Sequence, residues 1–201
     1  TVIRTGFGPA LLPAVDGFRA GDRKDGPVVN PSYWVFPALA DLDRAVPDRD
    51  WKAVAATGHA ILAATRIGST GLPPEWASLA GKDVAAADGF PAVFGYNALR
   101  VPLYIAWTAE HRRESLAPFM ARWSVEGTAR PPLAVVDLTS GRDLEPFADP
   151  GYRAVAALVA CSLEGTRVPD DLRTADVDHY YPATLRALAL VAVNMRHPTC
   201  W

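Results

Sequence analysis

Apolar residues recur along most of the chain at the three- and four-residue spacing of amphipathic helices, and no alternating run is long enough to predict a substantial sheet. The clearest helix lies within 48–68, where an apolar stripe runs from Trp51 to Leu62, with Asp48 near its start and Gly68 at its end. Four later helices are expected at approximately 97–109, 112–125, 150–163 and 179–195. The pattern therefore predicts an all-α fold of six or seven helices.

The first helix is expected within residues 30–45, in the stretch NPSYWVFPALADLDRA. Asn30 is a good N-cap, because its side-chain oxygen can accept a hydrogen bond from the first turn. Pro31 would occupy a first-turn position, where the missing N–H costs nothing. Pro37 is expected to kink or delay the helix.

Three segments are predicted to lie outside the helices, two of them as loops and one as a hairpin. The opening stretch 5–18 is punctuated by Gly and Pro and is expected to be a loop that crosses the surface. Residues 69–95 carry too many Gly and Pro for a regular element, and so long a loop inside a domain is usually functional. A small β-hairpin is expected near 133–144, around Ser140 and Gly141.

Composition and charge argue against nucleic-acid binding and against a transmembrane segment. The chain has 201 residues, half of them apolar and 21% charged, which fits one globular domain with a sizeable core. Lys and Arg total 20 against 22 Asp and Glu, so the basic excess that nucleic-acid binding needs is absent. No apolar run approaches the ~20 residues of a membrane span. We therefore expect neither a nucleic-acid partner nor a transmembrane segment.

The two cysteines leave two interpretations open. Cys161 lies in the apolar run AVAALVACSL, where a buried free thiol is the simpler interpretation. A bridge to Cys200 would instead join the last two helices and would fit an oxidising compartment.

Four segments, in order, resemble glycoside hydrolase family 8, a family of inverting β-glucanases. They are GFGPALLP, NPSYWVFPAL, GLPPEWASL followed by FGYNALRVPLY, and HYYPATLRAL. Their order and spacing both match across nearly the whole chain. The resemblance implies an (α/α)6 barrel with a sugar-binding cleft across one end. It also implies an endo-β-1,4-glucanase that cleaves cellulose-like chains without a metal or organic cofactor, in the periplasm or secreted.

The chain departs from that family in its length. A barrel of this kind needs twelve helices, and the general acid of the family is a Glu in an early Ser-Glu-Gly-like motif that no segment here resembles. We therefore expect residues 1–201 to be the C-terminal portion of one catalytic domain, inactive alone, against which an N-terminal segment packs. Half a barrel would leave apolar helix faces in water, at about 25 cal/mol per Å².

The second departure is Asn97, which stands where the family usually has its general-base Asp. Inverting glycosidases need an acid and a carboxylate base, and an amide cannot accept the proton. Three interpretations stay open: an engineered Asp→Asn change, a natural branch whose base lies elsewhere, and a natural non-catalytic relative. If the base has moved, the candidates are Asp88, Asp83 and Glu75. Asp88 is preferred because it lies closest to the helix start that carries Asn97.

Tyrosines at expected helix starts are the candidates for binding sugar. Sugar rings have apolar faces and polar rims, so a glucan cleft combines aromatic platforms with hydrogen-bond donors. By resemblance, Tyr96, Arg100 and Tyr181 surround the reacting sugar, and Tyr33 stacks on a ring. Tyr180 is a further candidate, and core packing is the alternative for each tyrosine.

Two alternatives to a cellulase follow from the same residues. Xylan, chitosan or mixed-linkage glucan could be the substrate of the same fold, with chitosan disfavoured because few acidic residues accompany the motifs. The chain could also belong to a non-catalytic glucan-binding or synthase-associated protein. No metal site is expected, because His59 lies in the middle of a helix without a second ligand nearby.

Overall fold

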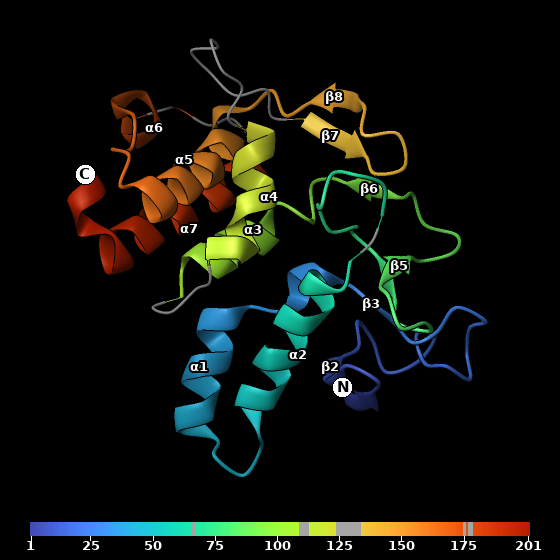
Figure 1. Cartoon of the computed structure of the whole chain (residues 1–201). Coiled ribbons are helices and arrows are strands. Elements are labelled where there is room, and N and C mark those ends of the chain that lie inside the picture. The colour runs from blue at the N-terminus through green and yellow to red at the C-terminus, as the bar shows by residue number, and fades with distance from the viewer. Residues whose placement is uncertain (66, 109–112, 124–133, 175, 177–178) are drawn as a thin grey trace. The chain divides into compact units, whose positions relative to one another are not determined.

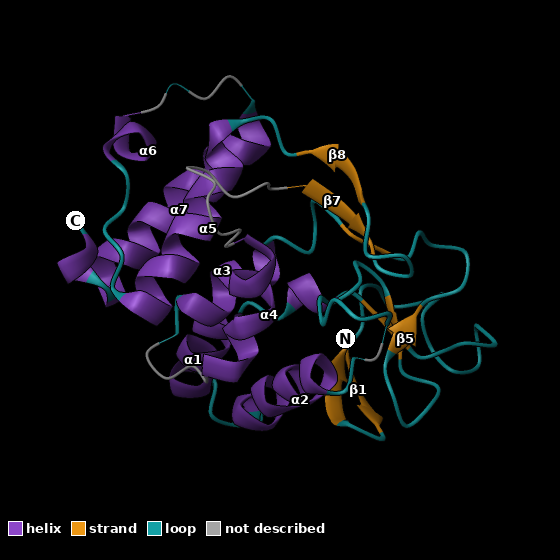
Figure 2. Cartoon of the chain, turned by 45° about the horizontal axis from the view of Figure 1, so that its top comes forward, coloured by secondary structure: helices purple, strands orange, loops and turns teal. Residues whose placement is uncertain are grey.

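Helices are the main elements of the fold (Figures 1 and 2). The computed structural model describes residues 1–201 except 66, 109–112, 124–133, 175 and 177–178. The described α-helices are α1 Phe36–Ala45, α2 Trp51–Ala63, α3 Arg100–Ala106, α4 Arg113–Trp123, α5 Pro150–Glu164, α6 Asp170–Thr174 and α7 Tyr180–Arg196. The short 3-10 helices are η1 Pro31–Tyr33 and η2 Pro198–Cys200. The helices predicted at 150–163 and 179–195 are confirmed, and parts of two others, at 109, 112 and 124–125, lie outside the described residues.

Short antiparallel strands accompany the helices, so the fold is mainly helical rather than purely so. The described strands are β1 Val2–Thr5, β2 Gly8–Leu11, β3 Val28–Val29, β4 Ala77–Ser78, β5 Ala85–Ala86, β6 Val93–Phe94, β7 Ala134–Asp137 and β8 Asp143–Pro146. They form one two-stranded sheet, β1-β2, and two three-stranded sheets, β3-β4-β5 and β6-β7-β8. Half of the described strands have only two residues and the others have four, which explains why no alternating apolar run predicted them.

The opening loop predicted at 5–18 is wrong in its first part. Val2 pairs with Leu11 and Thr5 with Gly8, so the chain begins as a β-hairpin. The Thr5 hydroxyl donates to the Gly8 carbonyl at 2.8 Å and accepts from the Phe7 N–H at 3.2 Å, which stabilises the turn. Gly8 has a φ of 120°, a conformation that side chains rarely adopt. Two of the Gly residues that suggested a loop, Gly6 and Gly8, therefore belong to a tight turn.

The hairpin expected near 133–144 is confirmed by β7 and β8, although residue 133 lies outside the described residues. The Asp137 carboxylate accepts hydrogen bonds from the backbone N–H and the hydroxyl of Ser140, at 2.7 and 2.8 Å. These bonds lower the pKa of Asp137. Gly141 follows with a φ of 73°, so the predicted Ser140-Gly141 pair does form the turn.

The first helices follow the predicted capping residues with small shifts. Asn30 caps η1 rather than α1, and α1 begins only at Phe36 because Pro37 occupies its first turn. Helix α2 is capped by Asp50, two residues after the predicted Asp48, and the Asp50 side chain accepts from the Ala53 N–H at 2.9 Å.

The chain divides into two compact units, each described by itself. Unit 1 comprises Thr1–Val101 and Val136–Arg142, and unit 2 comprises Pro102–Val135 and Asp143–Trp201. In unit 1, α1 packs on α2, and the fully buried core includes Trp34, Ile61, Leu72, Phe94 and Leu99.

In unit 2, α5 packs on α7, and α4 on α5. A Cβ added at Gly151 would lie 2.2 Å from the Pro182 carbonyl oxygen, so the two helix backbones touch there. A disulfide joins Cys161 to Cys200, whose Cα atoms are 6.0 Å apart. Of the two interpretations left open for the cysteines, the structure has the bridge.

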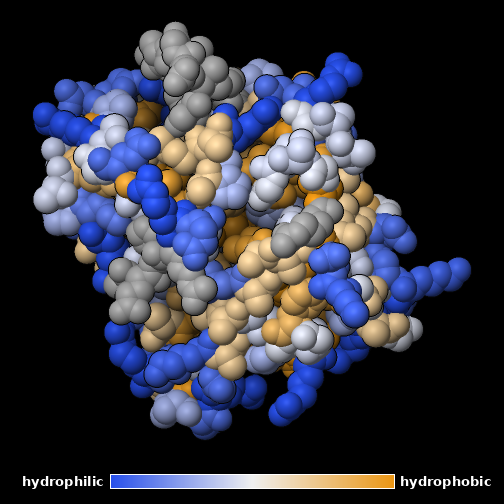
Figure 3. All heavy atoms as spheres, in the orientation of Figure 1, coloured by the Kyte–Doolittle hydropathy of each residue, from blue (hydrophilic) through white to orange (hydrophobic). Residues whose placement is uncertain are grey.

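Some large apolar side chains remain at the surface. Hydrophobic residues appear among hydrophilic ones on the face shown in Figure 3. On α7, Val191 and Met195 are four residues apart and are 45% and 56% exposed, so they share one apolar helix face. In the described part of the chain, no helix has both the length and the apolar character that crossing a bilayer requires.

The segment 69–95, predicted to have no regular element, contains the two-residue strands β4, β5 and β6. It is anchored to the segment that precedes β3. The rings of Phe18, Trp76 and Phe90 stack in sequence, with centroids 5.6 and 4.6 Å apart. Arg23 forms an ion pair with Asp25 at 2.9 Å, and the Asp25 carboxylate also accepts from the backbone N–H of Asp88 at 2.7 Å. These contacts fix the far end of the loop.

The Asp25 anchor is expected to weaken in acid. Hydrogen bonds from Arg23 lower the pKa of Asp25, so the folded state favours the carboxylate. The resulting stabilisation is present above the ordinary Asp pKa of about 3.9 and is lost as the pH falls through the lowered value. In urea unfolding between pH 6 and pH 2, Asp25→Asn should therefore be less stable than the parent at pH 6 and should lose less stability on acidification. Equal pH dependence of the two proteins would contradict this.

Candidate functional site

Arg100, at the start of α3, joins several predicted site residues of unit 1. One of its terminal nitrogens donates to the Ser32 hydroxyl at 2.7 Å and to the Asn97 side-chain oxygen at 2.8 Å. Its guanidinium carbon also lies 5.7 Å from the centre of the Tyr33 ring, within cation–π range. The predicted residues Tyr33, Asn97 and Arg100 are therefore brought together by the fold.

Two buried polar residues, Ser32 and Asn30, extend the hydrogen bonding of Arg100 into the interior. Asn30 and Ser32 are each only 1% exposed, and the Ser32 hydroxyl donates to the Asn30 side-chain oxygen at 2.6 Å. The other amide atom of Asn30, Nδ2, is buried without a hydrogen-bond partner among the described residues. Sequence reasoning assigned Asn30 only a capping role and missed Ser32. A polar pair next to a candidate tyrosine, in the motif Asn-Pro-Ser-Tyr, was the available signal.

The contact with Arg100 fixes the orientation of the Asn97 amide. Arginine has only donors, so the atom that faces it must be the oxygen of Asn97. The amide nitrogen of Asn97 is thus left as a donor directed elsewhere. Because an amide is not basic, Asn97 can hold a polar group through its nitrogen but cannot take a proton from it.

Glu75 is the carboxylate that contacts this site most directly. Its Oε1 accepts from the Asn97 backbone N–H at 2.7 Å. A Cβ added at Gly95 would lie 2.7 Å from that oxygen, so the glycine leaves room for the carboxylate. The N–H of Glu75 donates to the Val93 carbonyl at 3.0 Å, which aligns the segment before Trp76 with the segment before Asn97.

The other two acidic candidates lie in different surroundings. The backbone of Asp88 is tied to the Arg23–Asp25 pair through both its N–H and its carbonyl. Asp83 is exposed in the loop between β4 and β5. The nearness of Asp88 to Asn97 in sequence is therefore not reflected in any hydrogen bond between them in the described residues.

Two tyrosines of unit 1 are partly exposed, one in contact with Arg100 and the other next to Asn97 in the chain. Tyr33, the last residue of η1, and Tyr96, directly before Asn97, are each 39% exposed. Because each ring keeps a solvent-accessible surface beside hydrogen-bonding groups, both suit contact with a sugar ring.

The remaining predicted tyrosines belong to unit 2. Tyr180 and Tyr181 are the first residues of α7, and Tyr180 is 85% exposed. The Tyr181 ring lies 6.3 Å, centre to centre, from that of Tyr152 at the start of α5. Burial, followed by the nearby charge of Asp149, raises the pKa of Tyr152. The structure thus places the rings of Tyr152 and Tyr181 close together at the N-terminal ends of two packed helices.

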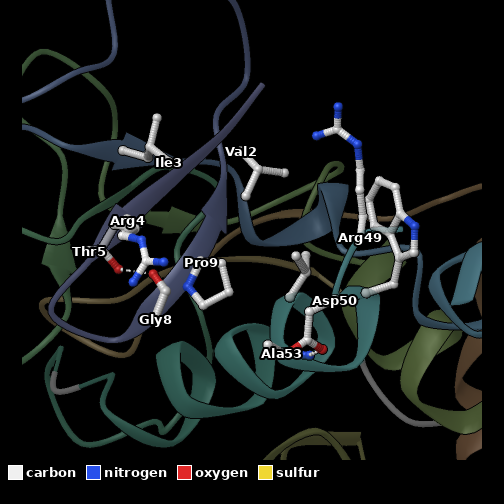
Figure 4. A pocket seen from close by; sticks show the side chains of 11 residues that line it. Val2, Ile3, Arg4, Thr5, Gly8, Pro9, Arg49, Asp50 and Ala53 are labelled. Carbon is white, nitrogen blue, oxygen red and sulfur yellow. Dashed lines mark hydrogen bonds between the residues drawn. The ribbon is translucent and has the colours of Figure 1, made fainter. Parts of the chain in front are cut away.

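A separate pocket of about 550 Å³ opens in unit 1 between the β1–β2 hairpin and the start of α2 (Figure 4). Apolar side chains such as Val2, Ile3 and Val54 line it together with Arg4 and Arg49. None of the sequence-predicted site residues lines this pocket. In the described residues, no cluster of three or more His, Cys, Asp or Glu side chains could hold a metal ion.

Residues 8–195 match the family model described as glycosyl hydrolases family 8. The chain is 35% identical over 185 residues to a probable endoglucanase of Novacetimonas hansenii, a match that covers 90% of this chain and 52% of that protein. It is 30% identical over 168 residues to an endoglucanase of Cellulomonas uda, which covers 72% of this chain and 45% of that protein.

A solved structure shows the same similarity in three dimensions. The endo-β-1,4-glucanase of Acetobacter xylinum is similar with a TM-score of 0.79 and 32% sequence identity, over 96% of this chain and 59% of that one. The chain thus spans about half the length of the curated relatives that it matches.

Proposed function

Because this chain belongs to glycosyl hydrolases family 8, we propose that the complete polypeptide containing it is an endo-β-1,4-glucanase that hydrolyses cellulose-like chains with inversion. The observation that carries this proposal is the cluster of Tyr33, Arg100 and Asn97, with Tyr96 beside it, in a member of that family. The rings offer apolar faces, and Arg100 and Asn97 offer donors to hydroxyl groups. Tyr180 and Tyr181 are proposed as further sugar contacts.

The catalytic domain is proposed to include an N-terminal segment that completes an (α/α)6 barrel and supplies the general acid. The relatives are about twice as long as the matched region. An inverting glycosidase needs a second carboxyl group, and this segment would provide it. Exposed apolar side chains such as Val191 and Met195 on α7 are also proposed to be buried by this segment. The 201-residue chain alone is accordingly proposed to be inactive.

Release of reducing sugar from carboxymethyl cellulose tests the proposed activity. The complete polypeptide is expected to release reducing ends, with a rapid loss of viscosity that marks internal cleavage, and residues 1–201 alone are expected to release none. Xylan and mixed-linkage glucan, assayed in parallel, test the alternative that the fold serves another β-glycan. Retained binding to cellulose with no release from any of these substrates would favour a non-catalytic glucan-binding protein and would contradict the proposal.

The proposed location is the periplasm or the cell exterior. The family resemblance suggests it, and the bond between Cys161 and Cys200 supports it, because disulfides persist in oxidising compartments. Mass spectrometry of the protein isolated from its host with thiols blocked tests this proposal: the pair should be oxidised and the protein recovered outside the cytoplasm.

A further inference from the structure

We propose that Ser32 and Asn30 are positioning residues of this enzyme, which act on the substrate only through Arg100. This inference rests on the proposed function, since it assigns the two residues a part in glucan hydrolysis. Each is only 1% exposed, so any effect on a sugar must pass through other side chains. The path is a series of hydrogen-bonded side chains in unit 1, called the polar relay below: Asn30, Ser32, Arg100 and Asn97.

The backbone N–H of Ser32 sets the direction of the first hydrogen bonds in the polar relay. It donates to the Asn30 side chain at 3.0 Å, so the atom of Asn30 that faces it must be the oxygen. That oxygen also lies 2.6 Å from the Ser32 hydroxyl and can only accept. The single hydroxyl hydrogen of Ser32 is therefore used within the interior, and the hydroxyl oxygen meets Arg100 with a lone pair.

Arg100 is held along one edge of its guanidinium by this arrangement. Its Nη2 donates to the Ser32 hydroxyl at 2.7 Å and to the Asn97 side-chain oxygen at 2.8 Å, and its Nε donates to the Asn97 carbonyl at 3.4 Å. In the described part of the chain, Nη1 has no acceptor. This nitrogen is therefore the donor that remains for a sugar oxygen.

The polar relay ends by deciding which atom Asn97 offers to a ligand. Because Arg100 occupies its side-chain oxygen, Asn97 presents its amide nitrogen, which is a donor. If the Ser32 hydroxyl instead directed its hydrogen at Arg100, two donors would face each other and the guanidinium would lose one of its anchors. The buried pair thus keeps both Arg100 and Asn97 as donors toward sugar oxygens, from an interior where hydrogen bonds are electrostatically stronger than in water.

The asparagine at position 30 also argues for a role beyond capping. Its Nδ2 is buried without an acceptor among the described residues, an arrangement that destabilises the folded state. Serine can accept from the first turn of a helix about as well and brings no such amide donor. The oxygen of Asn30, however, serves both the N–H and the hydroxyl of Ser32. Orienting Ser32 therefore accounts for a residue that a cap alone does not explain.

Ser32→Ala breaks the polar relay and keeps the cap, because the backbone N–H that donates to Asn30 remains. In the complete polypeptide, kcat/KM on carboxymethyl cellulose is expected to fall about tenfold, the lower end for loss of a hydrogen bond to a charged group. Thr57→Val is the matched control, since Thr57 is 2% exposed and its hydroxyl donates to the Ala53 carbonyl at 2.9 Å, outside the relay. It should lower the urea midpoint and leave kcat/KM unchanged. Parental kcat/KM in Ser32→Ala, or an equal loss in Thr57→Val, overturns the proposal.

Double variants give a readout that a merely structural role would not move. In an Arg100→Met background, Ser32→Ala should change kcat/KM by less than about twofold, since the group through which it acts is gone. Asn30→Ala should likewise add little to the loss of kcat/KM in Ser32→Ala, although the stability contributed by the cap is lost in both backgrounds. Losses that multiply when Ser32→Ala and Arg100→Met are combined overturn the proposal, whether or not Asn30→Ala folds. A parent enzyme that releases no reducing sugar would instead refute the proposed function, on which this inference depends.

Discussion

Replacing Arg100 with methionine is expected to lower kcat/KM on carboxymethyl cellulose by about 100-fold in the complete polypeptide. The guanidinium binds both the Ser32 hydroxyl and the Asn97 oxygen, and methionine leaves both unmatched. Hydrogen bonds from a charged group contribute about 1.5–3 kcal/mol each. Loss of some 2.7 kcal/mol of transition-state stabilisation corresponds to that hundredfold change. The orientation of Asn97, freed from its partner, should be lost at the same time.

Two further variants test whether the loss of kcat/KM is specific to the Arg100 site. Arg100→Lys keeps the charge but cannot reproduce the planar fork, so an intermediate loss is expected. Arg44→Met removes an arginine whose side chain is 78% exposed in a pair with Asp41 on α1, and it should leave kcat/KM unchanged. Parental activity of Arg100→Met, measured on protein with normal circular dichroism, would remove Arg100 from the proposed site.

Gly58→Ala should destabilise the protein by about 1–2 kcal/mol net, even though alanine is the better helix former. A Cβ at Gly58 would lie 2.3 Å from Cδ1 of Trp34. The indole cannot move away easily, because it is 1% exposed and its N–H donates to the Val54 carbonyl at 2.8 Å. Overpacking costs about 1–3 kcal/mol and occasionally more, which exceeds the gain in helix propensity of roughly 1 kcal/mol.

Urea unfolding followed by tryptophan fluorescence measures this change. Gly6→Ala is the matched control, since a Cβ there meets no atom within 4 Å, and its midpoint should stay close to that of the parent. Trp34 follows Tyr33 directly in the chain, so Gly58→Ala is also expected to weaken cellopentaose binding. An unchanged unfolding midpoint in Gly58→Ala would show that Trp34 has another position available.

The parts of the fold that depend on local chemistry could be predicted from the sequence. Asn30 acts as a cap, Pro37 delays α1, and Ser140-Gly141 forms a turn, because each depends on neighbours within a few residues. The hairpin Val2–Leu11 was missed, since the bonds of Thr5 around its turn cannot be told from a loop rich in glycine.

The candidate site, like the fold, could be predicted from the sequence only in part. The grouping of Tyr33, Asn97 and Arg100 followed from motifs in register, and the structure brings them into contact. The choice of Asp88 over Glu75 rested on nearness in sequence. The path of the chain decides the contact instead, because the pairing of Glu75 with Val93 brings two distant segments side by side. No local pattern reports a pairing of that kind.

The covalent link between Cys161 and Cys200 has a practical consequence for production of the protein. Closing a loop of 39 residues is worth about 4 kcal/mol in the chain-entropy description. A host cytosol that keeps thiols reduced would therefore yield molecules whose α5 and C-terminal turn lack this tether. Export to an oxidising space, with dithiothreitol kept out of purification buffers, is the appropriate route to material for the measurements proposed above.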